Sequence, residues 1–223
     1  MSTCSRRLSP FLVFLALLIF PAIANAQGQP LLQISRSRAS LDDQSNMMSS
    51  GRNVYDATLR GQQLDVRQYP NSSACVLVYP NGKYIVEKRD EHSVGHPKMK
   101  SAEGTLTPDD LQRLKAMLDD QELIKVRTPP APELPPDTQA IREAERLDVQ
   151  ISRAADLQQF TLTKERVKTG TTNAVSSSAS LTGMDTYLDN GAQYKKTLAP
   201  LVKWFDELAK KNKFTDAKSQ LCQ

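Results

Sequence analysis

The clearest β pattern in the chain is a pair of short apolar runs separated by a turn sequence. Residues 75–79 read CVLVY, residues 84–89 read YIVEKR, and PNGK lies between them. Asn-Gly between two β-rich runs is a strong hairpin signal, because a type I′ turn needs positive φ at both central residues. The pattern predicts a β-hairpin here, with a third strand over residues 98–106.

Two segments have the spacing of amphipathic helices. In residues 107–121, Thr107 suits the N-cap and Pro108 the first helical position. The apolar face of this helix is Leu111, Leu114, Met117 and Leu118. The second helix is predicted over residues 192–211 and either begins or bends at Pro200. Its apolar face is Leu198, Leu201, Val202, Phe205, Leu208 and Ala209.

The segment between these helices begins with a proline-rich stretch. Residues 127–137 carry prolines at positions 129, 130, 132, 135 and 136, which exclude a helix interior or a central strand. A stiff surface connector is the main interpretation, and a site for a polyproline reader is the alternative. Residues 139–146 predict a short helical turn. Residues 147–152 alternate strictly and residues 157–164 return, which predicts a second hairpin.

This order of elements predicts the α+β class. We expect a mainly antiparallel sheet from two hairpins, with two amphipathic helices on one face. Residues 27–54 are polar and weakly periodic, so we interpret them as a flexible leader. A single α+β domain should span residues 55–215, followed by a C-terminal tail over residues 216–223.

Residues 1–26 have the layout of a secretory signal peptide. Arg6 and Arg7 precede the apolar run FLVFLALLIF, and Ala24-Asn25-Ala26 is an A-x-A cleavage site. The ten-residue run is too short for a bilayer span, which needs about 20 apolar residues. We therefore expect an exported, periplasmic or extracellular protein with no stable membrane span after cleavage. An N-terminal membrane anchor is the alternative.

Composition limits the remaining classes. The chain has 223 residues, of which 39% are hydrophobic and 24% charged. These values exclude a polytopic membrane protein, a collagen-like fibre and a small disulfide knot. The net charge of +4 falls to +2 once Arg6 and Arg7 leave with the signal. No basic stripe with interleaved aromatics is present, so we expect no nucleic-acid partner.

Two cysteines, Cys75 and Cys222, remain after signal cleavage. In an oxidising compartment they predict one disulfide, which would close a loop of about 148 residues. The alternative is a buried thiol at Cys75 and an exposed thiol at Cys222. Neither cysteine lies in a C-x-x-C motif, so a catalytic cysteine is not expected.

Few residues suggest chemistry. His92 and His96 have the H-x3-H spacing of zinc ligands, and Glu91 adjoins them. They form a weak candidate metal site, and a solvated loop is the alternative. No catalytic or phosphate-binding motif occurs, so no catalytic residue or cofactor is predicted. Tyr79 and Tyr84 flank the predicted turn as candidate interaction residues, although core or cross-strand packing is the main interpretation.

The segments CVLVYPNGKY (residues 75–84) and GTLTPDDL (residues 104–111) carry a resemblance. They resemble small secreted bacterial α+β domains of unknown function, in which a hairpin is followed by a capped helix and then by a second hairpin and helix. The resemblance implies an exported α+β domain over about residues 73–210 and assigns no catalytic residue.

The main functional hypothesis is an exported, non-enzymatic binding protein. Its partner would be a protein or a cell-envelope component, and an inhibitor-like or envelope-associated module is one form of it. The alternative is a secreted hydrolase, assisted by a metal at His92 and His96.

The first prediction concerns the exported chain. Its intact mass should correspond to a start at Gln27. It should also lie about 2 Da below the mass of the reduced chain, because a disulfide removes two hydrogens. Mass spectrometry before and after reduction measures both values. A mass that retains residues 1–26 would contradict the signal peptide, and an unchanged mass on reduction would contradict the disulfide.

Overall fold

The computed structural model describes residues 28–40, 64–65, 71–90, 98–153, 156–170 and 184–217. About half of these residues lie in strands and about a quarter in helices. The strands are β1 (Leu32–Ser40), β2 (Leu64–Asp65), β3 (Ser72–Val78), β4 (Lys83–Asp90), β5 (Lys98–Thr105), β6 (Thr138–Arg153), β7 (Asp156–Thr169), β8 (Met184–Asp189) and β9 (Thr215–Asp216). The helices are α4 (Pro108–Leu118), α5 (Gln121–Ile124), the 3-10 turn η3 (Ala192–Tyr194) and α6 (Lys195–Lys211).

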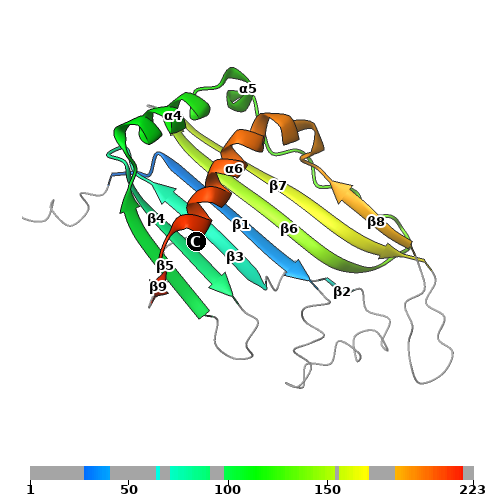
Figure 1. Ribbon diagram of the computed structural model, residues 1–223. Helices are drawn as coiled ribbons and strands as arrows, with labels where there is room; N and C mark the ends of the chain where they lie inside the picture. Colours follow the sequence, from blue (N-terminus) through cyan, green and yellow to red (C-terminus); the bar gives the residue numbers. More distant parts are fainter. Residues whose placement is uncertain are drawn as a thin grey trace, which may run out of the picture.

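All strands belong to one sheet with the order β8-β7-β6-β1-β3-β4-β5-β9, and β2 pairs with β6 outside this path. Every pair along the path is antiparallel, whereas β2 runs parallel to β6. Near its middle β1 pairs with β6 on one side and with β3 on the other (Figure 1). The first described strand therefore joins the two hairpins into one sheet.

The helices lie on one side of this sheet in two different positions. α6 crosses the face of the sheet, whereas α4 and α5 sit at one end of it (Figure 1). The buried residues of α6 recur every three or four positions, as an amphipathic helix requires: Leu198, Leu201, Phe205 and Ala209. α6 begins at Lys195, so the predicted start at Pro200 is wrong, and Pro200 lies inside the helix on its exposed side.

The main core lies between the helices and one half of the sheet face. Leu32 and Ile34 of β1 are fully buried in it, next to Val76 of β3 and Val149 of β6. Phe205 of α6 packs onto the same cluster. Burying such side chains stabilises the fold by about 1.5–3 kcal/mol each. No helix in the described ranges combines the length and the apolar character that a bilayer span requires.

The first hairpin is confirmed, but its turn is not of type I′. β3 and β4 pair antiparallel from Ser72–Asp90 to Val78–Tyr84. The amide of Gly82 donates to the carbonyl of Tyr79 at 2.9 Å, so Pro80 and Asn81 are the central turn residues. Gly82 follows them with φ of 84°. The loop thus has three residues and ends in a left-handed glycine, an arrangement that usually contains a type I turn. Pro80 cannot take the positive φ of a type I′ turn.

The helix predicted over residues 107–121 is confirmed as α4, which ends at Leu118 and is followed by the proline-rich loop after α5. Thr107 caps α4 by accepting from the Asp110 amide at 3.1 Å, as its sequence predicts. Residues 126–135 form no helix or strand. The loop covers the outer edge of β7, where the amide of Thr161 donates to the Thr128 hydroxyl at 3.0 Å. It thus protects a strand edge from pairing with another chain.

The second hairpin is confirmed and is longer than predicted. β6 spans 16 residues and β7 spans 14, with register shifts between Thr138 and Ala140 and between Ile141 and Glu143. The helical turn predicted at residues 139–146 is wrong, because this segment is part of β6. Its charged side chains match helical spacing by chance, and pairing with β1 and β7 decides its conformation.

The predicted α+β class, with two hairpins and two amphipathic helices on one face, is also wrong. The described chain is a long, mostly antiparallel sheet with few helices. Residues 32–40, which we placed in a flexible leader, form β1 instead. The error has a physical origin: β1 and the ends of β6 and β7 carry charged residues, and only pairing with distant strands makes them extended.

The packing of Tyr84 on Gly104 gives a stability prediction. A Cβ at Gly104 would lie 2.4 Å from the Tyr84 ring, whose hydroxyl donates to Asn212 at 2.9 Å. Gly104→Ala should therefore lower the free energy of unfolding by about 1–3 kcal/mol, measured by urea denaturation. Glu103→Ala, at an exposed neighbour, should change it by less than about 0.5 kcal/mol.

A double variant separates this contact from a backbone effect. In a Tyr84→Ala background the Gly104→Ala change should be neutral or stabilising, because glycine weakens a strand interior. An equal loss in both backgrounds would contradict the contact.

Candidate functional site

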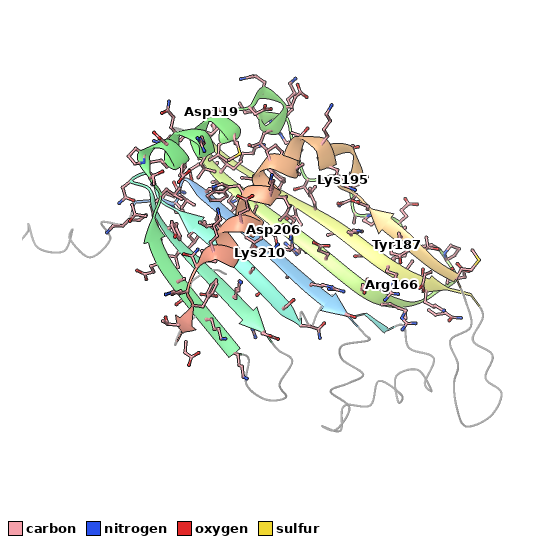
Figure 2. The ribbon with its side chains drawn as sticks, in the orientation of Figure 1. Asp119, Arg166, Tyr187, Lys195, Asp206 and Lys210 are labelled. Carbon is pink, nitrogen blue, oxygen red and sulfur yellow. The ribbon has the colours of Figure 1, made fainter. Side chains whose placement is uncertain are left out.

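The site lies on the helix-bearing face of the sheet, where this face changes from apolar to charged. β1 shows the change: Leu32 and Ile34 are buried under the helices, and Arg36 and Arg38 follow on the same face. The charged half continues on neighbouring strands. In the register of β6 and β7, Glu145 lies opposite Lys164, and Glu143 lies opposite Arg166. α6 ends above this boundary and contributes Asp206 and Lys210 (Figure 2).

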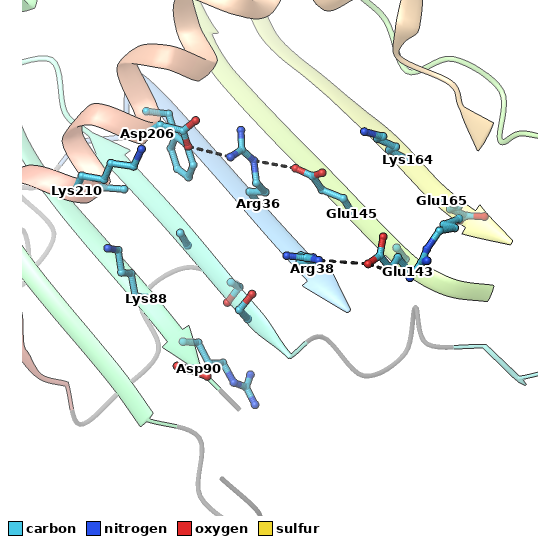
Figure 3. A pocket seen from close by; sticks show the side chains of 18 of the residues that line it. Arg36, Arg38, Lys88, Asp90, Glu143, Glu145, Lys164, Glu165, Asp206 and Lys210 are labelled. Atoms are coloured by element: carbon cyan, nitrogen blue, oxygen red, sulfur yellow. Dashed lines mark hydrogen bonds and ion pairs between the residues drawn. The ribbon is translucent and has the colours of Figure 1, made fainter. Parts of the chain in front are cut away.

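Arg36 is the centre of the charged half. Its Nη1 donates to Asp206 Oδ1 at 2.9 Å, and its Nε lies 3.3 Å from Glu145 Oε1 (Figure 3). Its guanidinium also lies over the ring of Phe205, 5.5 Å from the ring centroid. Arg36 thus joins β6 and α6 through two carboxylates and one aromatic ring, which a planar guanidinium suits better than an ammonium.

A second ion-pair group surrounds Glu143. Its Oε1 lies 3.3 Å from Arg38 Nη2 and 3.2 Å from Arg166 Nη2. Arg166 also contacts β8, where its Nη1 lies 3.4 Å from Asp185 Oδ2. One oxygen of each of the carboxylates Glu143, Glu145 and Asp206 therefore contacts an arginine.

Two lysines of the site are placed differently. Lys164 lies on β7 and Lys210 on the last turn of α6, on opposite sides of the Arg36 group (Figure 3). The ion pairs recorded on this face within the described ranges use arginines and neither of these lysines. Both side chains are exposed. Their ammonium groups can therefore meet an incoming anion without first breaking an arginine pair.

Lys88 of β4 adds a third amine at the border of the charged half. Its Nζ lies 4.3 Å from the centroid of the Phe214 ring. Partial burial lowers the pKa of Lys88 from its ordinary value, and the positive charge of Lys100 lowers it further. An anion beside Lys88 would oppose both effects, because it would favour the charged ammonium.

A continuous hollow, which we name the α6 trough, follows α6 across this boundary. It has two overlapping parts with volumes of about 680 Å³ and about 620 Å³, which we name the charged part and the apolar part. The apolar part takes its name from its leucine and valine wall, and charged side chains line the rest of it. The two parts share Arg36, Glu145, Lys164, Asp206 and Lys210. Leu147 of β6, Leu162 of β7, and Leu198 and Val202 of α6 form the apolar wall. Both volumes are in the range of ligand sites.

The structure does not test the predicted metal site. Glu91, His92 and His96 lie outside the described residues. Within the described residues no group of three or more His, Cys, Asp or Glu side chains is arranged to hold a metal ion.

The predicted cysteine pair is tested at one end only. Cys75 lies on β3 with 5% of its surface exposed and takes part in a disulfide bond. Neither Cys4 nor Cys222 belongs to the described residues. The pairing of Cys75 with Cys222 therefore stays a prediction.

The two candidate interaction tyrosines do not form a common site. Tyr84 packs on the main core, on the face that carries the helices. Tyr79 packs on the other face, with Cys75, Leu77 and Ile85. Neither ring lines the α6 trough. A role of either tyrosine in binding stays a prediction.

Sequence reasoning missed the residues that line the trough. The signal was present in residues 32–38, where Leu, Ile, Arg and Arg alternate with Gln and Ser at strand spacing. Residues 27–54 as a whole are polar and weakly periodic, which is why a flexible leader was expected there. The sequence also gave no means to bring Arg36, Glu145 and Asp206 together across 170 positions.

Comparison of the chain with protein-family models, curated proteins and solved structures found no match.

The Arg36 group gives a prediction about electrostatics. Arg36→Gln and Asp206→Asn, combined in a double-mutant cycle, should show a coupling of about 0.5–1 kcal/mol in the free energy of unfolding at low salt. The value is modest because the two side chains are 28% and 38% exposed. The coupling should fall as salt is added. A coupling of zero at low salt would contradict an energetically significant pair. The exposed Lys125–Glu122 pair, 68% and 67% exposed, serves as the weaker comparison.

Proposed function

We propose that this protein is an exported binding protein without catalytic activity of its own, and that it holds its ligand in the α6 trough. One observation carries the proposal. The trough joins an apolar wall to a charged floor whose carboxylates already contact arginines, with Lys164 and Lys210 at its border. Such a surface offers a ligand both apolar contact and positively charged groups.

The ion pairs of the floor favour recognition over catalysis. Arg36 contacts Asp206 and Glu145, and Glu143 is shared by Arg38 and Arg166. These contacts hold one oxygen of each carboxylate against an arginine and so fix the orientation of the charged groups. Fixed charges of this kind orient a partner and discriminate against wrong ones.

The sequence supports the export part of the proposal. Residues 1–26 have the n-region, apolar run and cleavage site of a signal peptide. A protein of the periplasm or the cell exterior would meet envelope components, which combine apolar and charged parts. The shape of the trough, beside a single helix, favours a slender partner over a broad protein surface.

The proposal is tested by filling the trough without removing core residues. Ala199 is exposed on α6 and lines the apolar part, so Ala199→Trp should occupy the trough. Ala116 is exposed on α4 outside the trough, and Ala116→Trp is the matched control. Both changes cost less than about 1 kcal/mol in helix propensity.

The probe is anilinonaphthalene sulfonate, an anionic dye with an apolar ring system, titrated by fluorescence. The native protein should bind it saturably, and Ala199→Trp should weaken binding about tenfold or more, with Ala116→Trp unchanged. Circular dichroism checks that both variants are folded. Equal binding by all three proteins would overturn the trough as the ligand site.

A further inference from the structure

We infer that the ligand of the α6 trough is a long-chain fatty acid, a single alkyl chain that ends in one carboxylate. The inference rests on the proposed function and names its ligand. The alkyl chain would lie along the apolar wall, and the carboxylate would lie over the Arg36 group, which Lys164 and Lys210 flank on opposite sides.

The trough matches one alkyl chain in length, and its apolar wall contacts the chain along about one turn of α6, from Leu198 to Val202. Leu147 and Leu162 are directly paired across β6 and β7, and Leu198 and Val202 face the same part of the trough from α6. Leu198 and Lys210 both line the trough and are about 18 Å apart along the helix axis, from a rise of about 1.5 Å per residue. An extended alkyl chain of a dozen carbons fits within this length.

The trough does not offer a second chain an equivalent wall. The α6 side of its apolar part also carries Lys195, Lys203 and Glu207, all of which are exposed. A double-chain lipid would place its second chain against these charged groups. The burial of apolar surface therefore favours a single chain.

The charged end favours an anion because Glu143, Glu145 and Asp206 each already contact an arginine through one oxygen. Glu145 and Asp206 contact Arg36, which leaves the ammonium groups of Lys164 and Lys210 on either side of this group (Figure 3). Lys88 adds a further positive charge in the same charged part. Uncharged amphiphiles would leave these amines to water.

A single carboxylate fits better than a phosphate. Lys210 lies in the last turn of α6, where the helix dipole is negative and opposes an approaching dianion. The arginines of this floor already contact carboxylate groups, at 2.9–3.3 Å around Arg36. A monoanion meets the amines with less opposition from the helix end.

The test compares three ligands of equal chain length by isothermal titration at pH 8: laurate, dodecyl phosphate and the uncharged dodecyl maltoside, each below its micelle concentration. The variant Lys164→Met/Lys210→Met removes both charges and keeps the apolar stems. Lys115→Met/Lys196→Met is the matched control, because these exposed lysines lie outside the trough and give the same net charge.

The native protein should bind laurate more tightly than either other ligand. Lys164→Met/Lys210→Met should weaken laurate about tenfold and leave the maltoside unchanged, with the control pair close to native. Lengthening the acid from ten to twelve carbons should tighten binding by up to about fourfold per buried methylene.

Other outcomes overturn the inference, and they show whether the proposed function fails with it. Tighter binding of dodecyl phosphate, or equal laurate binding by both lysine pairs, rejects the carboxylate site. If Ala199→Trp still blocks the dye in that case, the trough remains a ligand site of other chemistry. If laurate binds equally well to Ala199→Trp, the binding lies elsewhere and both proposals fail.

Discussion

The pairing of β1 between β6 and β3 is the constraint on which the rest of the structure depends. Residues 32–40 bond along one edge to the second hairpin and along the other to the first. Without this strand the two hairpins have no common edge, and the order of the sheet cannot form. Its register also decides the faces, because a shift by one residue would move Ile34 out of the core and Arg36 away from Asp206.

The division of β1 into an apolar and a basic half sets the position of the helices and of the trough. α6 buries Leu201 and Phe205 against the apolar half, because that is where apolar area can be removed from water. The basic half cannot be covered in the same way, since Arg36 and Arg38 would lose solvation without enough partners. At the boundary, the contacts of Arg36 with Asp206 and Glu145 compensate the lost solvation of its guanidinium. The trough opens beside these contacts.

The sequence predicted those parts of the fold whose signals are local. The hairpin at β3 and β4, the Thr107 cap of α4 and the amphipathic face of α6 each depend on residues within one turn or one helix. The type of turn after Tyr79 was missed because Pro80 takes part in it. Residues 139–146 and β1 were misread for one reason: charged residues at strand spacing have little local preference. The pairing between β1 and β6, whose partners lie more than 100 residues apart, determines their conformation.

The sequence by itself led us to expect an export signal. It also determined the strongest local elements and the sets of apolar residues that each element buries. Only the tertiary structure decided the candidate site. Arg36, Glu145, Lys164 and Asp206 come from four separate elements, and no motif or spacing connects them. The physical reason is that the spacing of apolar residues is a property of each element alone. Contacts between charged side chains of different elements depend on strand order, on register and on the direction in which α6 crosses the sheet.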